Sequence, residues 1–237
     1  MTVPVLELSR VTKDFHGLRP LRLQALTLAA GEHVAILGFD RTMAEVFVNL
    51  VTGVTLPDEG EIRVFGRATS AIADSADWLA TVDRFGIVSE RAVLIDQFTV
   101  IQNLAMPFTL DVEPPPDDIR RQAEHIAAEV GLADTSWQMP AAGLDGPART
   151  RVRLGRALAL NPAILLLEHV NAGAAADDAV ELGADIRSIA DRRGAAIVAV
   201  TADSAFARAV ASRVVTLEPA TGHLKAQAGR RWFGRRV

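Results

Sequence analysis

Carboxylates and one histidine are the side chains of this sequence best suited to chemistry. Five of them lie in or after apolar, strand-like segments: Asp40, Glu45, Glu90, Glu168 and His169. Such oxygen and nitrogen ligands bind divalent cations, and a histidine with a pKa of about 6.5 is suited to general-base catalysis. A metal site requires residues from separate loops to converge, so we expect none. For His169 the simpler expectation is a structural histidine that donates one hydrogen bond at the end of a buried strand.

Lysine and cysteine chemistry is largely excluded. Lys13 and Lys225 are the only lysines among 25 basic residues, and the sequence contains no cysteine. Disulfides, thiolate metal sites and cysteine nucleophiles are therefore excluded. Chemistry that depends on a lysine in the interior of the chain is excluded as well.

The overall composition is that of a globular protein. The chain has 237 residues, 49% of them hydrophobic, and a net charge of -4. These values argue against wholesale disorder and against a basic nucleic-acid binder, so we expect no nucleic-acid partner. Neither an apolar run of about 18 residues nor a signal-peptide pattern is visible, so we expect a cytoplasmic location.

The elements that position the five polar residues alternate between strands and helices. Apolar runs predict strands at 3–8, 23–28, 33–39, 163–167, 195–201 and 213–218, and helical periodicity predicts helices at 42–53, 123–133, 149–160, 178–193 and 205–212. Alternating units of this kind predict an α/β fold with a parallel sheet. We expect a core formed by 1–90 and 149–218, a helical subdomain at 91–148, and a basic, aromatic tail at 219–237.

The helix after the strand at 33–39 has its own start signal. Thr42 and Glu45 have the spacing of a capping box, in which the threonine accepts from the N3 amide and the glutamate reaches back to the N-cap N–H. In such a helix start, side chains of the helix itself accept hydrogen bonds from backbone N–H groups that have no partner within the helix. We therefore expect the Glu45 carboxylate at the positive end of this helix.

In order along the chain, these segments resemble the nucleotide-binding domain of an ABC transporter, from about residue 4 to residue 218. The matching segments are VTKDFHG (11–17), ILGFDRTMAEV (36–46), LPDEGEIRVFG (56–66), GIVSE (86–90), FTVIQNLAMPF (98–108), LDGPARTRVRLGRALALNP (144–162), ILLLEHVNAG (164–173) and AVTADSAFARAVASRVVTLE (199–218). The resemblance implies a P-loop NTPase (RecA-like) core with an antiparallel β subdomain and an inserted helical subdomain. It also implies transmembrane permease partners and a peripheral place on the inner face of a membrane.

The phosphate-binding loop departs from the family pattern G-x-x-x-x-G-K-[ST]. Gly38 is kept, but Met43 replaces the second glycine, Ala44 replaces the lysine, and Glu45 replaces the hydroxyl residue that holds Mg²⁺. The positions that still resemble nucleotide contacts are Phe15, Gly38, Arg41 and Thr42.

The other catalytic positions of the family are also replaced. Glu90 stands for the Q-loop glutamine, Glu168 for the Walker B aspartate, His169 for the general-base glutamate, Ala202 for the switch histidine and Ala175 for the D-loop aspartate. The signature motif is represented by Leu144, Asp145, Gly146, Pro147 and Ala148. The changes around the phosphates add about two negative charges, and a unit pair at ~4 Å is worth about 4 kcal/mol at an effective dielectric near 20. We therefore expect weak or absent ATP and Mg²⁺ binding, no required cofactor and a structural or regulatory role.

Two alternatives stay open at this point. The chain could still bind ATP through Phe15, backbone amides and Arg41, and share a turnover site with a homologous partner chain. It could instead be a soluble adaptor protein that no longer takes part in transport. For Arg41 we expect solvation or a pair with Asp40.

Partner contacts are predicted in the segment that matches the permease-docking region of the family. The residues are Arg91, Val93, Leu94, Ile95 and Phe98, an apolar surface with a basic edge. The alternative is that Leu94 and Ile95 anchor the helical subdomain. A competent ABC ATPase or a second copy of the chain are further possible partners, and the C-terminal RRWFGRRV suits an anionic surface or a solvated tail.

Overall fold

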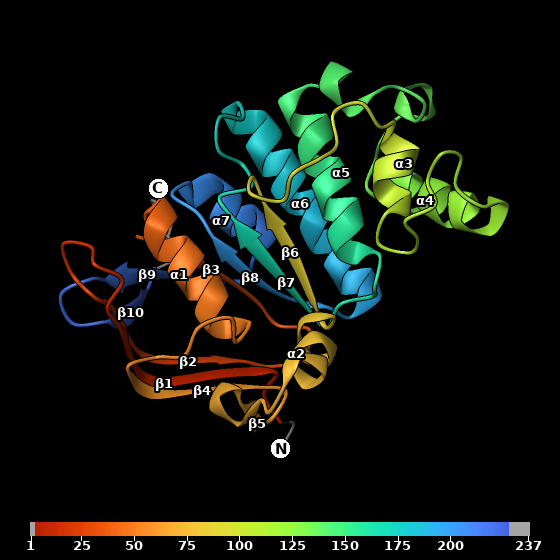
Figure 1. Cartoon of the computed structure of the whole chain (residues 1–237). Helices are drawn as coiled ribbons and strands as arrows, with labels where there is room; N and C mark the ends of the chain where they lie inside the picture. The colour runs from red at the N-terminus through yellow and green to blue at the C-terminus, as the bar shows by residue number, and fades with distance from the viewer. Residues whose placement is uncertain (1–2, 228–237) are drawn as a thin grey trace, which may run out of the picture.

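The computed structural model describes residues 3–227, which form two sheets and two groups of helices (Figure 1). The strands are β1 (Leu6–Lys13), β2 (Leu21–Leu28), β3 (His33–Leu37), β4 (Glu59–Val64), β5 (Arg67–Ala68), β6 (Phe85–Ser89), β7 (Ile164–Glu168), β8 (Ala196–Val200), β9 (Arg213–Glu218) and β10 (His223–Ala226). The α-helices are α1 (Arg41–Val51), α2 (Ser75–Val82), α3 (Val100–Ala105), α4 (Asp117–Glu129), α5 (Gly146–Leu158), α6 (Ala176–Arg193) and α7 (Ser204–Val210). Short 3-10 turns occur at Thr69–Ala71, Asp134–Ser136 and Ala141–Gly143.

The larger sheet holds the most apolar strands. Its order is β10-β9-β3-β8-β7-β6, and all its strands are parallel except β10, which runs antiparallel to β9. Every residue of β3, β7 and β8 is buried, as expected for strands covered on both faces. Because the strands are parallel, the loops after β3, β6, β7 and β8 leave the sheet at one edge. Those loops carry Gly38, Glu90, His169 and Ala202.

The smaller sheet is antiparallel, with the order β2-β1-β4-β5. Helix α1 lies between the two sheets (Figure 1). The buried face of α1 is formed by Ala44, Phe47, Val48, Leu50 and Val51. This packing fixes where the N-terminal end of α1 meets the carboxyl edge of the larger sheet.

Successive residues of β3 point into two different cores. Val34 and Ile36 belong to the core that contains α1 and the smaller sheet, whereas Ala35 and Leu37 belong to the core shared with α5, α6 and α7. Side chains alternate between the faces of a strand, so one apolar run serves both layers. The second core continues into α3 and α4, whose buried residues include Leu104 and Ile126.

Helix α5 and the C-terminal segment differ most clearly from the sequence prediction. Helix α5 begins at Gly146, not at Arg149, because the Asp145 carboxylate caps it. Residues 223–226, expected in a tail, form β10, whose residues pair with the edge strand β9. The RRWFGRRV segment lies outside the described residues.

Candidate functional site

The N-terminus of α1 is capped by Asp40, and the predicted Thr42–Glu45 capping box is wrong. Asp40 has an extended backbone, and its Oδ1 accepts a hydrogen bond from the Met43 N–H at 2.7 Å. The helix therefore begins at Arg41, and Thr42 already lies inside the first turn. Aspartate is at least as good an N-cap as threonine, so the earlier residue takes that position.

The Arg91 guanidinium lies between Glu45 on α1 and Glu168 at the end of β7. Its Nη1 is 3.0 Å from Glu45 Oε1, and its Nη2 donates to Glu168 Oε2 at 2.7 Å. The Glu168 side chain is only 8% exposed, whereas Arg91 is 43% exposed. Burial alone lowers the pKa of Arg91, but the hydrogen bond and charge of Glu168, together with the charge of Glu45, raise that pKa above its usual value.

A second arginine pairs with the remaining glutamate. Arg41 Nη1 lies 3.4 Å from Glu90 Oε2, although both side chains are exposed. The expected pairing of Arg41 with Asp40 is not formed, because the Asp40 carboxylate is turned toward the helix amides. Two arginines thus face three glutamates at this edge of the sheet. The negative charge expected from sequence is therefore largely compensated within the chain.

The start of α5 repeats the arrangement found at α1. Asp145 Oδ1 accepts from the Ala148 N–H at 2.8 Å, and Gly146 and Pro147 form the first helical positions. Leu144, just before the cap, packs against the core of the larger sheet. A cavity of about 380 Å³ beside this helix start is lined by Asp145, Gly146, Pro147, Glu90 and residues 172–174. At both helix starts a carboxylate of the protein itself already accepts an N-terminal amide hydrogen bond.

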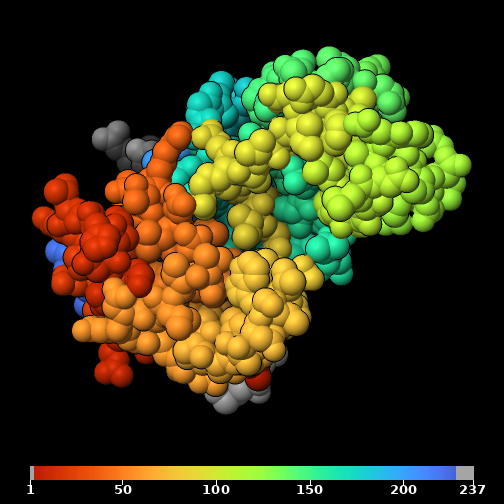
Figure 2. All heavy atoms as spheres, in the orientation of Figure 1, coloured from red at the N-terminus to blue at the C-terminus, as the bar shows by residue number. Residues whose placement is uncertain are grey.

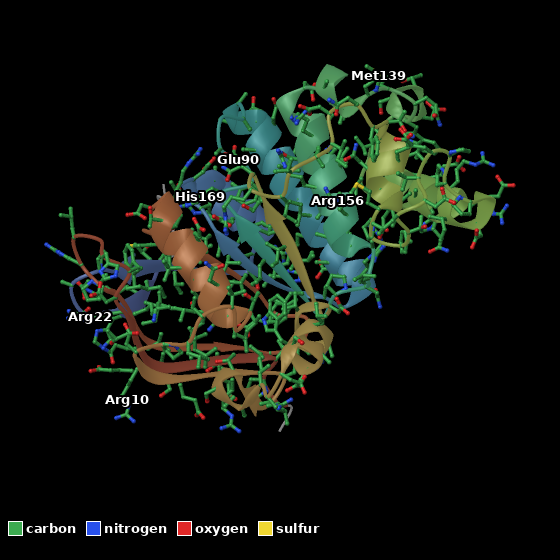
Figure 3. The ribbon with its side chains drawn as sticks, in the orientation of Figure 1. Arg10, Arg22, Glu90, Met139, Arg156 and His169 are labelled. Carbon is green, nitrogen blue, oxygen red and sulfur yellow. The ribbon has the colours of Figure 1, made fainter. Side chains whose placement is uncertain are left out.

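His169 lies near this edge (Figure 3), directly after β7, and Ala202 lies in the loop after β8. No hydrogen bond is formed by either side chain within the described residues. Within residues 3–227, His169 Nε2 is buried and has no hydrogen-bond partner, so this nitrogen does not form the single hydrogen bond expected of the histidine. Ala202 is exposed and has no polar side-chain atom. Beside them, Thr201 donates to Asn171 Oδ1 at 2.9 Å and Asn171 donates to Asp203 Oδ2 at 3.2 Å, which ties the loops after β7 and β8 together.

Several predicted nucleotide contacts line one cavity. Phe15, Gly38 and Thr42 surround a space of about 570 Å³, with Met43 also in its wall. Gly38 has φ +94°, a left-handed conformation that favours glycine. Arg41 is not part of this wall, because its side chain points to Glu90.

The predicted docking segment contributes less apolar surface than expected. Leu94 is 3% exposed and belongs to the core, Ile95 and Phe98 are half-buried, and only Val93, at 74%, is fully open to solvent. Leu94 therefore fits the alternative of an anchor better than docking, because its side chain is buried in the same core as residues of α3 and α5. Arg91 does not form a free basic edge, because its guanidinium is bound to Glu45 and Glu168.

Sequence reasoning missed the pairing of Arg91 and the cap formed by Asp40. The cap could have been found, since Asp40 stands directly before the first helical residue and three residues before Met43. The pairing of Arg91 had no local signal, because its partners are 46 and 77 positions away along the chain, on α1 and β7.

The described residues contain no arrangement that indicates a metal site or a membrane span. Within residues 3–227 no group of three or more His, Asp or Glu side chains is placed to hold a metal ion. In the same range no helix combines the length and apolar character needed to cross a bilayer.

Comparison with known proteins gives a consistent family match. The family model described as ABC transporter matches residues 21–170. The methionine import ATP-binding protein MetN of Brucella abortus is 29% identical over 218 residues, which cover 92% of this chain and 58% of the relative. The chain thus spans little more than half the length of that relative. The lipoprotein-releasing system ATP-binding protein LolD of Saccharophagus degradans is 27% identical, with 92% of this chain and 96% of the relative covered.

Solved structures match the fold. The cbiO1 protein of Clostridium perfringens, part of an ABC transporter complex, has a TM-score of 0.77 at 18% identity, covering 93% of this chain and 86% of its own. A dimeric ATP-binding cassette bound to ADP and Pi has a TM-score of 0.75 at 23% identity, covering 96% of this chain and 100% of its own. At these identities the likeness shows the fold alone, and it confirms the α/β cassette architecture expected from sequence.

Proposed function

Because this chain belongs to the ABC transporter family of ATP-binding cassettes, we propose that it is a non-hydrolysing cassette subunit. It docks on transmembrane permease subunits at the inner, cytoplasmic face of a membrane and acts there structurally or as a regulator of transport. It needs no cofactor and binds ATP and Mg²⁺ weakly or not at all. The single observation that carries this proposal is the Arg91 guanidinium held between Glu45 and Glu168.

Glu168 stands at the position that holds Mg²⁺ in the family, and here it already has a cation. A metal ion or a phosphate at this place would have to separate Arg91 from Glu168, whose side chain is 8% exposed. Separation would leave a nearly buried carboxylate without its partner, which is costly in a low-dielectric site. The internal ion pairs therefore compete directly with Mg-ATP.

The two helix starts support the same conclusion. In a working cassette the N-terminus of one helix receives the phosphates and the signature helix of a partner closes over them. Here Asp40 and Asp145 accept the hydrogen bonds of the Met43 and Ala148 amides. A triphosphate would meet like charge at both places and one amide fewer at each.

The 570 Å³ cavity favours the alternative of a chain that binds nucleotide at a shared site. Phe15, Gly38 and Thr42 line it, so a purine base has room beside an aromatic ring. Met43 occupies the wall where the family has glycine, and Arg41 is paired elsewhere. This cavity supports contact with a base but supplies no lysine for the phosphates.

ATP hydrolysis by the full chain and by membrane complexes that contain it tests the proposal. The tagged chain should co-purify with permease subunits from its native membranes, and alone it should hydrolyse no ATP above the buffer rate. His169→Ala and the matched control His125→Ala, on the exposed side of α4, should leave the rate of the complex unchanged. Hydrolysis by the chain alone that His169→Ala abolishes and His125→Ala preserves contradicts the loss of catalysis. A chain recovered only free of membranes contradicts docking.

A further inference from the structure

A small cavity lies between helix α2 and the hairpin of β4 and β5, at the edge of the larger sheet opposite to the glutamates. Its volume is about 180 Å³, and its apolar lining includes Val64, Phe65, Ile72 and Ala80. Arg84, which also lines the cavity, directly precedes β6, whereas Glu90 directly follows this strand. At ~3.3 Å per residue of extended chain, about 20 Å therefore separates the cavity from the glutamates. Figure 2 shows α2 in gold on the surface of the molecule, below the yellow-green helix α4.

This cavity combines an apolar base with a cationic mouth. Val64 is 3% exposed, whereas Arg67 and Arg84 are open to solvent. No Asp or Glu is among the described residues that line the space. Arg67 already has a partner, because its Nη1 lies 2.5 Å from Asp77 Oδ1. Within residues 3–227, no carboxylate oxygen lies within 4.0 Å of the Arg84 guanidinium, so one uncompensated cation faces the cavity.

The Arg84 guanidinium is held in one orientation by an aromatic ring. Its Cζ lies 3.4 Å from the centroid of the Phe65 ring, and that ring packs against Phe85 with centroids 5.3 Å apart. The backbone of Arg84 is fixed as well, because its carbonyl accepts from the Ala163 N–H at 2.8 Å. Stacking covers one face of a guanidinium and leaves the N–H groups at its edge available for an acceptor. A cation fixed in this way loses little conformational freedom when it binds an anion.

We propose that this cavity binds a small organic acid, with its hydrocarbon body against Val64 and Ile72 and its carboxylate paired with the edge of the Arg84 guanidinium. A planar carboxylate matches the donors of a guanidinium, and the apolar base suits a hydrocarbon that inorganic phosphate lacks. An apolar cavity of ~150 Å³ can hold benzene. The space of about 180 Å³ therefore accommodates an acid whose body has about six carbon atoms. This site depends neither on permease docking nor on the exclusion of nucleotide.

The bound acid would also connect α2 to the smaller sheet. Helix α2 has no buried residue, and one of its few anchors is the hydrogen bond from Trp78 Nε1 to the Thr52 carbonyl at 3.0 Å. A ligand in the cavity contacts Ala80 on α2 and Val64 on β4 at the same time. Local opening of α2 would have to release that ligand. At ten times the dissociation constant, the amides of α2 should therefore exchange their hydrogens about tenfold more slowly.

Isothermal titration calorimetry with the full chain tests the site. Benzoate and hexanoate are the probes, benzyl alcohol and hexanol are controls without a carboxylate, and acetate and phosphate are controls without the hydrocarbon body. The two acids should bind with a dissociation constant of about 1 mM or below, as expected for ligands of fewer than about ten non-hydrogen atoms. Each control retains only one of the two kinds of contact and should bind at least about tenfold more weakly.

Variants then locate the site without relying on one substitution. Arg84→Gln removes the cation and should weaken benzoate binding about tenfold, whereas Arg121→Gln, at an exposed arginine of α4, should leave it unchanged. Ala80→Phe keeps Arg84 but fills the cavity and should abolish binding. Leu79→Phe is its matched control, because Leu79 is 52% exposed on the same helix and does not line the cavity. Exchange of the α2 amides without ligand shows whether each variant keeps the helix folded.

Several results would overturn this inference, and none of them bears on the proposed transport role. Alcohols that bind as tightly as the acids would show that no carboxylate pairs with Arg84. Acetate or phosphate binding as tightly as benzoate would indicate a surface anion contact without a hydrocarbon site. Titrations of both acids that do not saturate by about 10 mM, or affinities unchanged by both Arg84→Gln and Ala80→Phe, would show that the cavity is not a binding site.

Discussion

Glu168 is the most buried carboxylate of the site, and Arg91 is its only charged partner among residues 3–227. Arg91→Ala should lower the free energy of unfolding by about 2 kcal/mol, because it leaves Glu168 without its hydrogen bond and cation. Arg41→Ala is the matched control, since Arg41 is 75% exposed and pairs at 3.4 Å. It should cost about 0.5 kcal/mol or less. Urea denaturation measures both, and equal effects would mean that the Arg91 pair contributes no more than a surface ion pair.

The cap of α1 gives a second comparison between neighbouring residues. Asp40→Ala should cost about 1 kcal/mol, because the Met43 N–H loses its acceptor. Thr42→Ala should cost far less, since Thr42 lies inside the helix and caps nothing. Thermal melting of the two variants decides between them. A larger loss for Thr42→Ala would support the capping box that the structure contradicts.

For single residues, the sequence predicted which residues occupy the catalytic positions of the family better than it predicted the contacts that their side chains make. The replaced positions Ala44, Glu90 and His169 could be named from motif order alone. The pairing of Arg91 could not, because it depends on how the loop after β6 crosses toward α1 and β7, which no local pattern encodes. The Asp40 cap could have been predicted from its position directly before the helix. The capping-box spacing of Thr42 and Glu45, however, favoured a cap two residues later.

Among the elements, α4 and α6 are joined by one well-packed ion pair. Arg193 Nε donates to Glu129 Oε1 at 2.8 Å, and Arg193 also donates to the Leu158 carbonyl at the end of α5. The hydrogen bond from Arg193 holds the pKa of Glu129 below its usual value of 4.5, although burial acts in the opposite direction. This pair therefore links three helices around the second core.

The pair predicts a pH dependence with a defined sign. Glu129 has a lower pKa when folded than when unfolded, so its contribution is present above about pH 4.5 and is lost as the pH falls through the folded pKa. Glu129→Gln should cost about 1 kcal/mol near pH 7, and this difference from wild type should shrink toward about pH 3. The exposed Glu181→Gln is the control and should show no such trend. A constant difference across the pH range would contradict the pairing.

Element prediction from sequence succeeded where apolar runs were long. The runs at 33–39, 163–167 and 195–201 became β3, β7 and β8, because strands buried on both faces need continuous apolar residues. β10 was missed because HLKA is short and polar and is defined by pairing with β9. Its existence depends on the neighbouring strand more than on its own composition.

Across the whole molecule, the alternation of strands and helices predicted the parallel sheet, and the second, antiparallel sheet was expected from the resemblance to an ABC cassette. The electrostatic state of the site did not follow from the order of motifs. Counting charges at the replaced positions indicated an excess of negative charge. In the structure, Arg91 and Arg41 contribute two positive charges beside the three glutamates and form ion pairs with them. In the proposed function, weak or absent nucleotide binding is therefore attributed to the ion pairs already formed by the glutamates and to the capped helix starts, and less to charge repulsion.

Calorimetric titration of Mg-ATP into the full chain tests the proposed exclusion of nucleotide directly. No saturable heat is expected at concentrations up to about 1 mM, where a ligand with a micromolar dissociation constant would saturate its site. A saturable isotherm that weakens when Phe15→Ala removes the aromatic ring would contradict the exclusion, because it would place a nucleotide in the cavity beside Gly38.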